Sequence, residues 1–171
     1  MKIFLIGFMG SGKTTLGKRL ALKLGYRFID MDKEIETATN MSISQYFSDF
    51  GEDAFRETEN KILKSSDLPV DAIIATGGGA PCFFDNLEWM NKNGLTIYLS
   101  LSPKALALRL ANATDERPIL KNLKGELLEA FIAERLKARD SFYTQAKLTI
   151  MGADQTPERV IGILKEKGYL K

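Results

Sequence analysis

Residues 7–14 read Gly-Phe-Met-Gly-Ser-Gly-Lys-Thr, and this segment restricts the chain to few folds. It matches G-x-x-x-x-G-K-[ST] and lies between an apolar run of strand length and a stretch typical of a helix. Its glycines allow backbone N–H groups to converge on phosphate oxygens, and the helix N-terminus adds its positive dipole end. The segment therefore predicts a phosphate-binding loop (P-loop). The alternative, an ordinary glycine-rich turn, accounts for fewer of its positions.

The remaining chain alternates apolar runs of strand length with amphipathic stretches. The runs cover residues 3–6, 26–29, 72–75, 96–101 and 147–150. Predicted helices cover residues 14–24, 84–91 and 103–112, a further stretch through 139, and a last helix that Thr156 caps. Parallel strands need long crossover connections, which are usually helices, so the pattern predicts an α/β fold with helices on both faces of a parallel sheet. At 171 residues we expect one domain, spanning residues 1–171.

Composition removes several classes of site. The chain has no histidine and one cysteine, Cys82, which excludes disulfide frameworks, Cys/His zinc sites and histidine bases. A net charge of +2 does not favour a nucleic-acid or membrane surface, and no apolar stretch reaches the roughly 18 residues of a membrane span. We expect a cytoplasmic protein without nucleic-acid or membrane partners. We also expect a monomer, because no exposed apolar helix face stands out.

The P-loop and the next acidic pair predict a nucleotide and metal site. Lys13 is expected to bridge the β- and γ-phosphates, and the Thr14 hydroxyl to coordinate Mg²⁺. Asp30 and Asp32 end the second apolar run, and in an extended chain this spacing places both carboxylates on one side. One carboxylate could hold the waters of Mg²⁺, and the other could orient a substrate hydroxyl and accept its proton. The alternative is a helix N-cap followed by a solvated acid.

Glycines and arginines further along favour a small anionic substrate. Three glycines at residues 77–79 follow an apolar strand, so the backbone there can approach a ligand closely, although a plain turn would also use them. Arg56, Arg117 and Arg139 each lie near an apolar or ring residue. A planar guanidinium pairs with carboxylate or phosphate through two hydrogen bonds. A surface role remains the alternative for any one of them.

Taken together, these motifs resemble the shikimate kinase family in order and rough spacing. The matching segments are the P-loop, Asp-Met-Asp, Phe-Arg-Glu-Thr-Glu, Gly-Gly-Gly, Glu-Arg-Pro and Arg-x-x-x-Tyr. The resemblance spans nearly the whole chain. It implies a nucleoside-monophosphate-kinase-like, three-layer αβα fold with a five-stranded parallel sheet, a helical substrate-binding region at residues 32–60 and a mobile lid at 112–124. It also implies transfer of the γ-phosphate of ATP to the 3-hydroxyl of shikimate, a step of chorismate and aromatic amino acid biosynthesis.

The resemblance also implies an acceptor site. Arg56 and Arg139 would bind the carboxylate of shikimate, and Asp32 would contact the ring hydroxyls as the candidate base. Glu59, on the same helix face as Arg56, would hold that guanidinium in position. The other expected members are Phe47 and Phe55, which would flank the ring, together with Gly77, Gly78 and Gly79.

The implied nucleotide site combines the P-loop with distant residues. Arg117 would be the lid arginine that closes on the phosphates of ATP, Arg109 would lie near the adenine, and Asp30 would reach Mg²⁺ through water. The expected nucleotide contacts are Gly10, Ser11, Gly12, Lys13, Thr14, Thr15, Arg109, Arg117 and Gln155.

Alternatives stay open both for one site residue and for the activity. The family usually has Arg-x-Pro-Leu-Tyr where this chain has Arg-Asp-Ser-Phe-Tyr, so Arg135, one helical turn before Arg139, is a rival for its role; the distance to Tyr143 favours Arg139. The chain could instead phosphorylate another small polyol acid, such as gluconate, or a nucleoside monophosphate, or it could be an ATP-binding switch. A kinase would require an acceptor for turnover, whereas a switch would hydrolyse ATP slowly without one.

Overall fold

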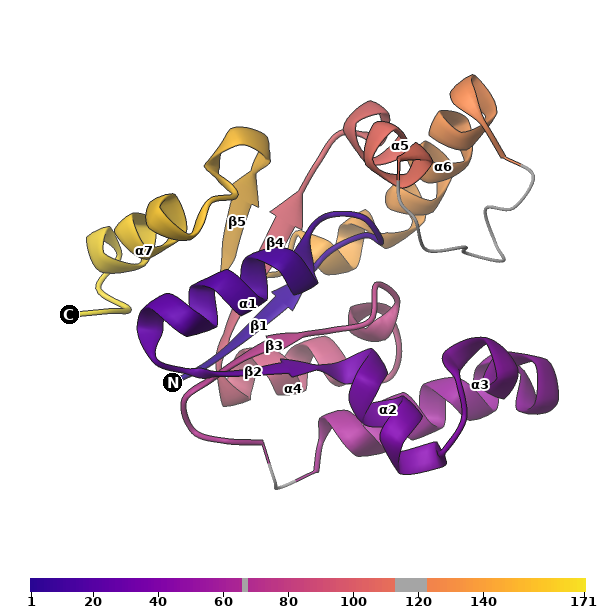
Figure 1. The fold of residues 1–171 in the computed structure, drawn as a ribbon, viewed down its shortest axis with the longest axis horizontal. Coiled ribbons are helices and arrows are strands. Elements are labelled where there is room, and N and C mark those ends of the chain that lie inside the picture. Colours follow the sequence, from indigo (N-terminus) through magenta and orange to yellow (C-terminus); the bar gives the residue numbers. More distant parts are fainter. Residues whose placement is uncertain (66–67, 113–122) are drawn as a thin grey trace.

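The computed structural model describes residues 1–65, 68–112 and 123–171. Its centre is a five-stranded sheet in the order β2-β3-β1-β4-β5, with every neighbouring pair parallel (Figure 1). This confirms the predicted parallel sheet, and it supplies the strand order, which the sequence pattern does not contain. The strands are β1 Lys2–Ile6, β2 Arg27–Asp30, β3 Ala72–Ala75, β4 Leu95–Ser100 and β5 Leu148–Met151.

Helices cover both faces of the sheet. Successive residues of a strand point to opposite faces, so Ile3 packs in one core with residues of α1 and α7, and Phe4 packs in a second core with residues of α3, α4 and α6. These two cores make the three layers of the predicted αβα sandwich. The helices are α1 Lys13–Leu24, α2 Met31–Thr39, α3 Ile43–Leu63, α4 Asn86–Asn93, α5 Pro103–Ala111, α6 Gly125–Tyr143 and α7 Pro157–Glu166, with short 3₁₀ turns η1 Ala80–Cys82 and η3 Gly152–Asp154.

Two pairs of helices lie beyond the edge of the central sheet. In Figure 1, α2 and α3 project at the lower right, and α5 and α6 lie together at the upper right. Ser42 caps α3 by accepting the N–H of Gln45. At Gly51 the backbone leaves the helical region (φ 81°, ψ 175°), so α3 is two helical segments joined by a kink.

Two predicted helix boundaries are wrong. The helix expected at residues 84–91 begins at Asn86, because Phe84 has a positive φ of 50° and the preceding residues form η1. The helix expected to end near Arg139 continues to Tyr143, so Arg139 and Tyr143 lie one turn apart on α6. In the described part of the chain, no helix is both long and apolar enough to span a membrane.

Candidate active site

The carboxyl ends of neighbouring strands bring the predicted motifs together. Asp30 at the end of β2 pairs with Ala75 of β3, and Ala75 pairs with Leu5 of β1. The P-loop follows β1, and the segment containing Gly77, which we call the triple-glycine loop (residues 77–79), follows β3. Ligands of open parallel sheets bind at such strand ends. The arrangement therefore places three of the sequence motifs around one site.

The P-loop wraps around the side chain of Lys13. Its Nζ atom donates hydrogen bonds to the carbonyl oxygens of Gly7 (2.8 Å) and Phe8 (2.9 Å). Gly7 has φ 144°, and a Cβ atom there would lie 2.9 Å from the carbonyl oxygen of Leu99, so the close turn requires glycine. The loop thus holds a positive charge where helix α1 begins, as an anion-binding loop requires.

Thr14 and Asp30 are directly linked. The Thr14 hydroxyl donates to Asp30 Oδ2 (3.0 Å), and Asp30 Oδ1 accepts the N–H of Asp32 (3.2 Å), which caps α2. Mg²⁺ binds through oxygen ligands and usually keeps several waters, using one or two carboxylates plus phosphates of the substrate. In the described residues no group of three or more His, Cys, Asp or Glu side chains could hold a metal. The adjacent hydroxyl and carboxylate fit a Mg²⁺ that takes its other ligands from phosphate and water.

The expected geometry of Asp32 is wrong, although its location suits the site. Asp32 lies in the first turn of α2, not in an extended strand, because Asp30 ends β2 and caps the helix. Asp32 nevertheless lines a pocket of about 480 Å³ together with Lys13, Thr14 and Gly78. The helix-cap alternative and the proposed functional role are therefore compatible, because Asp30 caps helix α2 while Asp32 lines the pocket.

Arg56 is buried beside the triple-glycine loop. It is 8% exposed, and its guanidinium donates to Glu59 Oε2 (2.7 Å) and to Glu52 Oε1 (3.2 and 3.3 Å). Phe55 and Phe47 pack on one another with ring centroids 4.4 Å apart and lie within 5.2 and 5.9 Å of Arg56 Cζ. The expected pairing of Arg56 with Glu59 is present. Glu52 is a further partner of Arg56. The sequence analysis missed it, although a glutamate four residues before an arginine on a helix indicates such a pair.

Glu59 has one oxygen that lacks a hydrogen-bond partner among the described residues. Its Oε1 atom is buried, and a Cβ atom on Gly77 would lie only 2.5 Å away from it. Burial raises the pKa of Glu59, and the charge of Arg56 acts in the opposite direction. Glycine at position 77 therefore provides the space in which Glu59 and Asp32, whose Oδ1 lies 3.3 Å from the same Cβ position, both approach the loop.

Arg139 reaches the triple-glycine loop from α6. Tyr143, one turn later, donates its hydroxyl proton to the carbonyl oxygen of Gly78 (2.6 Å), and Arg139 Nη1 lies 3.5 Å from the Tyr143 hydroxyl. Arg135 is exposed and lies over the ring of Phe131, 5.3 Å from its centroid. The geometry therefore favours Arg139 over its rival.

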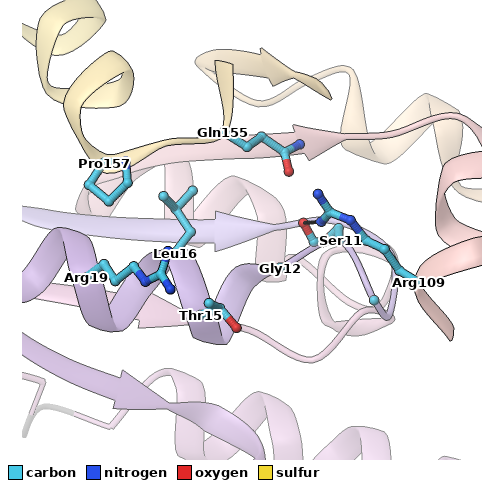
Figure 2. A pocket seen from close by; sticks show the side chains of 9 residues that line it. Ser11, Gly12, Thr15, Leu16, Arg19, Arg109, Gln155 and Pro157 are labelled. Atoms are coloured by element: carbon cyan, nitrogen blue, oxygen red, sulfur yellow. Dashed lines mark hydrogen bonds between the residues drawn. The ribbon is translucent and has the colours of Figure 1, made fainter. Parts of the chain in front are cut away.

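A second pocket, of about 380 Å³, lies along the other side of the P-loop (Figure 2). Arg109 Nη1 donates to the carbonyl oxygen of Ser11 (3.1 Å), which ties α5 to the P-loop. Gln155 Nε2 donates to the carbonyl oxygens of Ser100 (3.1 Å) and Ile150 (3.3 Å). The lining residues are Gly10, Ser11, Gly12, Thr15, Leu16, Arg19, Arg109, Gln155 and Pro157.

This second pocket brings together several of the expected nucleotide contacts. Arg109 and Gln155 lie across it from Thr15 in Figure 2, and Leu16 and Pro157 add apolar surface. Leu16, Arg19 and Pro157 were not among the expected contacts, because nothing in their local sequence indicates a ligand. Arg117 and most of the expected lid at residues 112–124 lie outside the described residues.

Comparisons with known proteins agree with these motifs. A family model described as shikimate kinase matches residues 9–167. A shikimate kinase of Parabacteroides distasonis is 51% identical over 148 residues, which are 86% of each chain. The chain is similar to the crystal structure of shikimate kinase from Bacteroides thetaiotaomicron (TM-score 0.89, 39% identity, 98% of each chain covered). It is also similar to shikimate kinase from Acinetobacter baumannii in complex with shikimate (TM-score 0.86, 32% identity, covering 99% of this chain and 95% of the other).

Proposed function

This chain belongs to the shikimate kinase family, and from that membership we propose that it phosphorylates the 3-hydroxyl of shikimate with ATP. The acceptor oxygen forms a bond to the γ-phosphorus as the bond from that phosphorus to the bridging oxygen of ADP breaks. The hydroxyl proton passes to the carboxylate of Asp32. The products are shikimate 3-phosphate and ADP, a step of chorismate and aromatic amino acid biosynthesis.

The observation that carries this proposal is the pair of arginines beside the triple-glycine loop. Arg56 is buried and held by Glu59, and a Cβ atom on Gly79 would lie 2.5 Å from its Nη2 atom. Arg139 Nη1 lies 3.5 Å from the corresponding position on Gly78. A site for a nucleotide alone would not need two guanidinium groups at this loop. Two planar guanidinium groups suit a small acceptor that carries a carboxylate.

Transfer of the phosphoryl group depends on positioning and charge stabilisation more than on covalent catalysis. Lys13 and the backbone N–H groups of the P-loop are proposed to bind the β- and γ-phosphates, where negative charge develops. Asp32, which lines the same pocket as Lys13, is proposed to orient the acceptor hydroxyl and accept its proton. Arg117 is proposed to contact the phosphates as well; its position lies outside the described residues.

Mg²⁺ is proposed at the linked pair formed by Thr14 and Asp30. When bound, this ion would neutralise phosphate charge and orient the γ-phosphate. The Thr14 hydroxyl would be a direct ligand, and Asp30 would hold one of the ion's waters. ATP would place its adenine in the second pocket, between Arg109 and the apolar side chain of Pro157.

A coupled assay of ADP release tests the proposed function. The parent protein is supplied with ATP and Mg²⁺ and with shikimate, gluconate or nucleoside monophosphates in turn. We expect turnover that depends on shikimate and is near background with the other acceptors. A preference for gluconate or for a nucleoside monophosphate would assign the site to that acceptor. Slow ATP hydrolysis that no acceptor accelerates would favour a nucleotide switch.

A further inference from the structure

The aromatic ring closest to the Arg56 guanidinium belongs to Phe83. Its ring centroid lies 4.4 Å from Arg56 Cζ, compared with 5.2 Å for Phe55 and 5.9 Å for Phe47. Phe55 and Phe47 share helix α3 with Arg56, whereas Phe83 follows η1, the turn that comes after the triple-glycine loop. The contact therefore joins the two segments that the proposed acceptor would touch.

The turn that carries Phe83 is linked to helix α3 through the buried side chain of Asn86. Asn86 is fully buried; its backbone N–H donates to the carbonyl oxygen of Phe83 (3.3 Å), and its side-chain Nδ2 donates to that of Ala80 (2.9 Å). Its Oδ1 accepts from Asn60 Nδ2 of α3 (2.6 Å). The same helix thus carries Arg56 and anchors the turn that presents Phe83.

The next residue, Phe84, has an unfavourable backbone conformation. Its φ is 50°, in the left-handed region that bulky side chains rarely adopt, and its own side chain is 62% exposed. Such conformations persist only where the surroundings fix them, and they cluster at functional sites. Here the strained residue separates Phe83 from helix α4. The Phe84 side chain is exposed, so it is the ring of Phe83 that the turn places against the Arg56 guanidinium.

An aromatic ring can hold a guanidinium without using its N–H donors, whereas a carboxylate accepts hydrogen bonds from them. A guanidinium has five N–H donors, and Glu59 and Glu52 take hydrogen bonds from Nη1, Nε and Nη2 of Arg56. An aromatic ring attracts the cation through its π-face and uses none of these donors. Phe83 can therefore restrain the Arg56 group while the remaining N–H groups of Nη1 and Nη2 stay available to a ligand carboxylate.

We propose that Phe83 is a positioning residue for acceptor binding, whose ring holds the Arg56 guanidinium in the orientation that receives the carboxylate of the acceptor. This inference rests on the proposed function, because it requires that Arg56 bind the acceptor. According to this inference, the turn after the triple-glycine loop contributes to the affinity for the acceptor and does not contribute to the affinity for the nucleotide.

The test compares Phe83→Leu, which keeps apolar volume but removes the ring, with Phe83→Tyr, which keeps the ring. Phe84→Leu is the matched control, because it makes the same change at the neighbouring exposed position. The KM values for shikimate and ATP and the kcat are measured for each variant. KM does not depend on the fraction of enzyme that is folded, so a loss of stability does not imitate the expected effect.

We expect Phe83→Leu to raise the KM for shikimate by roughly three- to thirtyfold, the range that a cation–π contact corresponds to. The KM for ATP should change less than about twofold, and Phe83→Tyr and Phe84→Leu should both stay near the parent. An unchanged KM for shikimate in Phe83→Leu, or an equal rise in the KM for ATP, would overturn the inference while leaving the proposed function intact. A parent protein without turnover on shikimate would overturn both.

Discussion

At the scale of single residues, Arg56 illustrates how burial sets the importance of a charge pair. Glu59 is 1% exposed, whereas the side chain of Glu52, the other partner of Arg56, is 57% exposed. Solvent-exposed ion pairs contribute little to stability, but removing one member of a buried pair leaves an uncompensated charge. We therefore expect Glu59, and not Glu52, to control the orientation of the Arg56 guanidinium.

Glu59→Gln should change how acceptor binding depends on pH. Burial raises the pKa of Glu59, so as the pH falls its carboxylate takes up a proton at a higher pH than an exposed glutamate would. Protonation weakens its bond to Arg56, so in the parent the KM for shikimate should rise on acidification. In Glu59→Gln the KM should be higher at neutral pH and lack this rise. Steady-state kinetics at a series of pH values from neutral to acidic measures the effect.

Glu52→Gln is the control for this measurement. It removes the exposed partner of Arg56 and leaves the buried one, so the rise in KM on acidification should persist. An acid-dependent rise that also persists in Glu59→Gln would contradict the role given to Glu59.

Lys13→Ala should abolish turnover and leave the protein folded. Lys13 donates hydrogen bonds to the carbonyl oxygens of Gly7 and Phe8, and its proposed partners are the phosphates of ATP. Loss of one preorganised charge at a transition state costs on the order of 10²- to 10³-fold in kcat. Lys18→Ala, on the exposed surface of the same helix, is the matched control and should keep normal activity. Near-normal kcat in Lys13→Ala would contradict the phosphate-binding role of the P-loop.

At the scale of elements, the end of helix α6 is attached to the loop after strand β3. Tyr143 is fully buried and stacks on Tyr98, with ring centroids 4.9 Å apart. Burial raises the pKa of Tyr143 well above its usual range, so the hydroxyl stays protonated and donates to the carbonyl oxygen of Gly78. This bond connects the helix that carries Arg139 to the triple-glycine loop.

Tyr143→Phe should weaken both stability and acceptor binding. The variant keeps the stacked ring but removes the hydroxyl that donates to Gly78, so the carbonyl oxygen of Gly78 loses this hydrogen bond, which costs about 1–3 kcal/mol. Denaturation in urea measures the loss of unfolding free energy, and kinetics should show a higher KM for shikimate with little change in the KM for ATP. Tyr98→Phe, which keeps the hydrogen bond to Gly78, should leave the KM for shikimate near the parent value. Equal KM values for both Phe variants would contradict the link between α6 and the loop.

Local patterns predicted the elements that depend on local chemistry. Strand β3 occupies the predicted residues 72–75, and the P-loop connects a strand to a helix as its motif requires. Asp32 was placed in extended chain because its spacing from Asp30 fits a strand, but the capping oxygen of Asp30 starts the helix one residue earlier. The kink at Gly51 and the contact of Phe83 with Arg56 were not predicted. The contact of Phe83 with Arg56 depends on packing between segments, which a local pattern does not encode.

At the scale of the whole molecule, the strand order creates the site. Because β3 lies between β2 and β1, the residues that follow these strands meet at one end of the sheet. Helix α3 then brings Arg56, and helix α6 brings Arg139, to the triple-glycine loop between them. Residues far apart in the sequence therefore form one acceptor site. We propose that the chain functions as a single domain and as a monomer.

Calorimetric titration of shikimate into the parent, Arg56→Ala, Arg139→Ala and Arg135→Ala tests this acceptor site most directly. Hydrogen bonds to charged groups contribute about 1.5–3 kcal/mol each, so we predict at least about tenfold weaker shikimate binding in Arg56→Ala and in Arg139→Ala. Arg135→Ala, one turn away on α6, should bind shikimate as the parent does, and all four proteins should bind ATP with similar affinity. Weakened binding in Arg135→Ala alone would assign the role to Arg135, and unchanged binding in both Arg56→Ala and Arg139→Ala would contradict the proposed acceptor site.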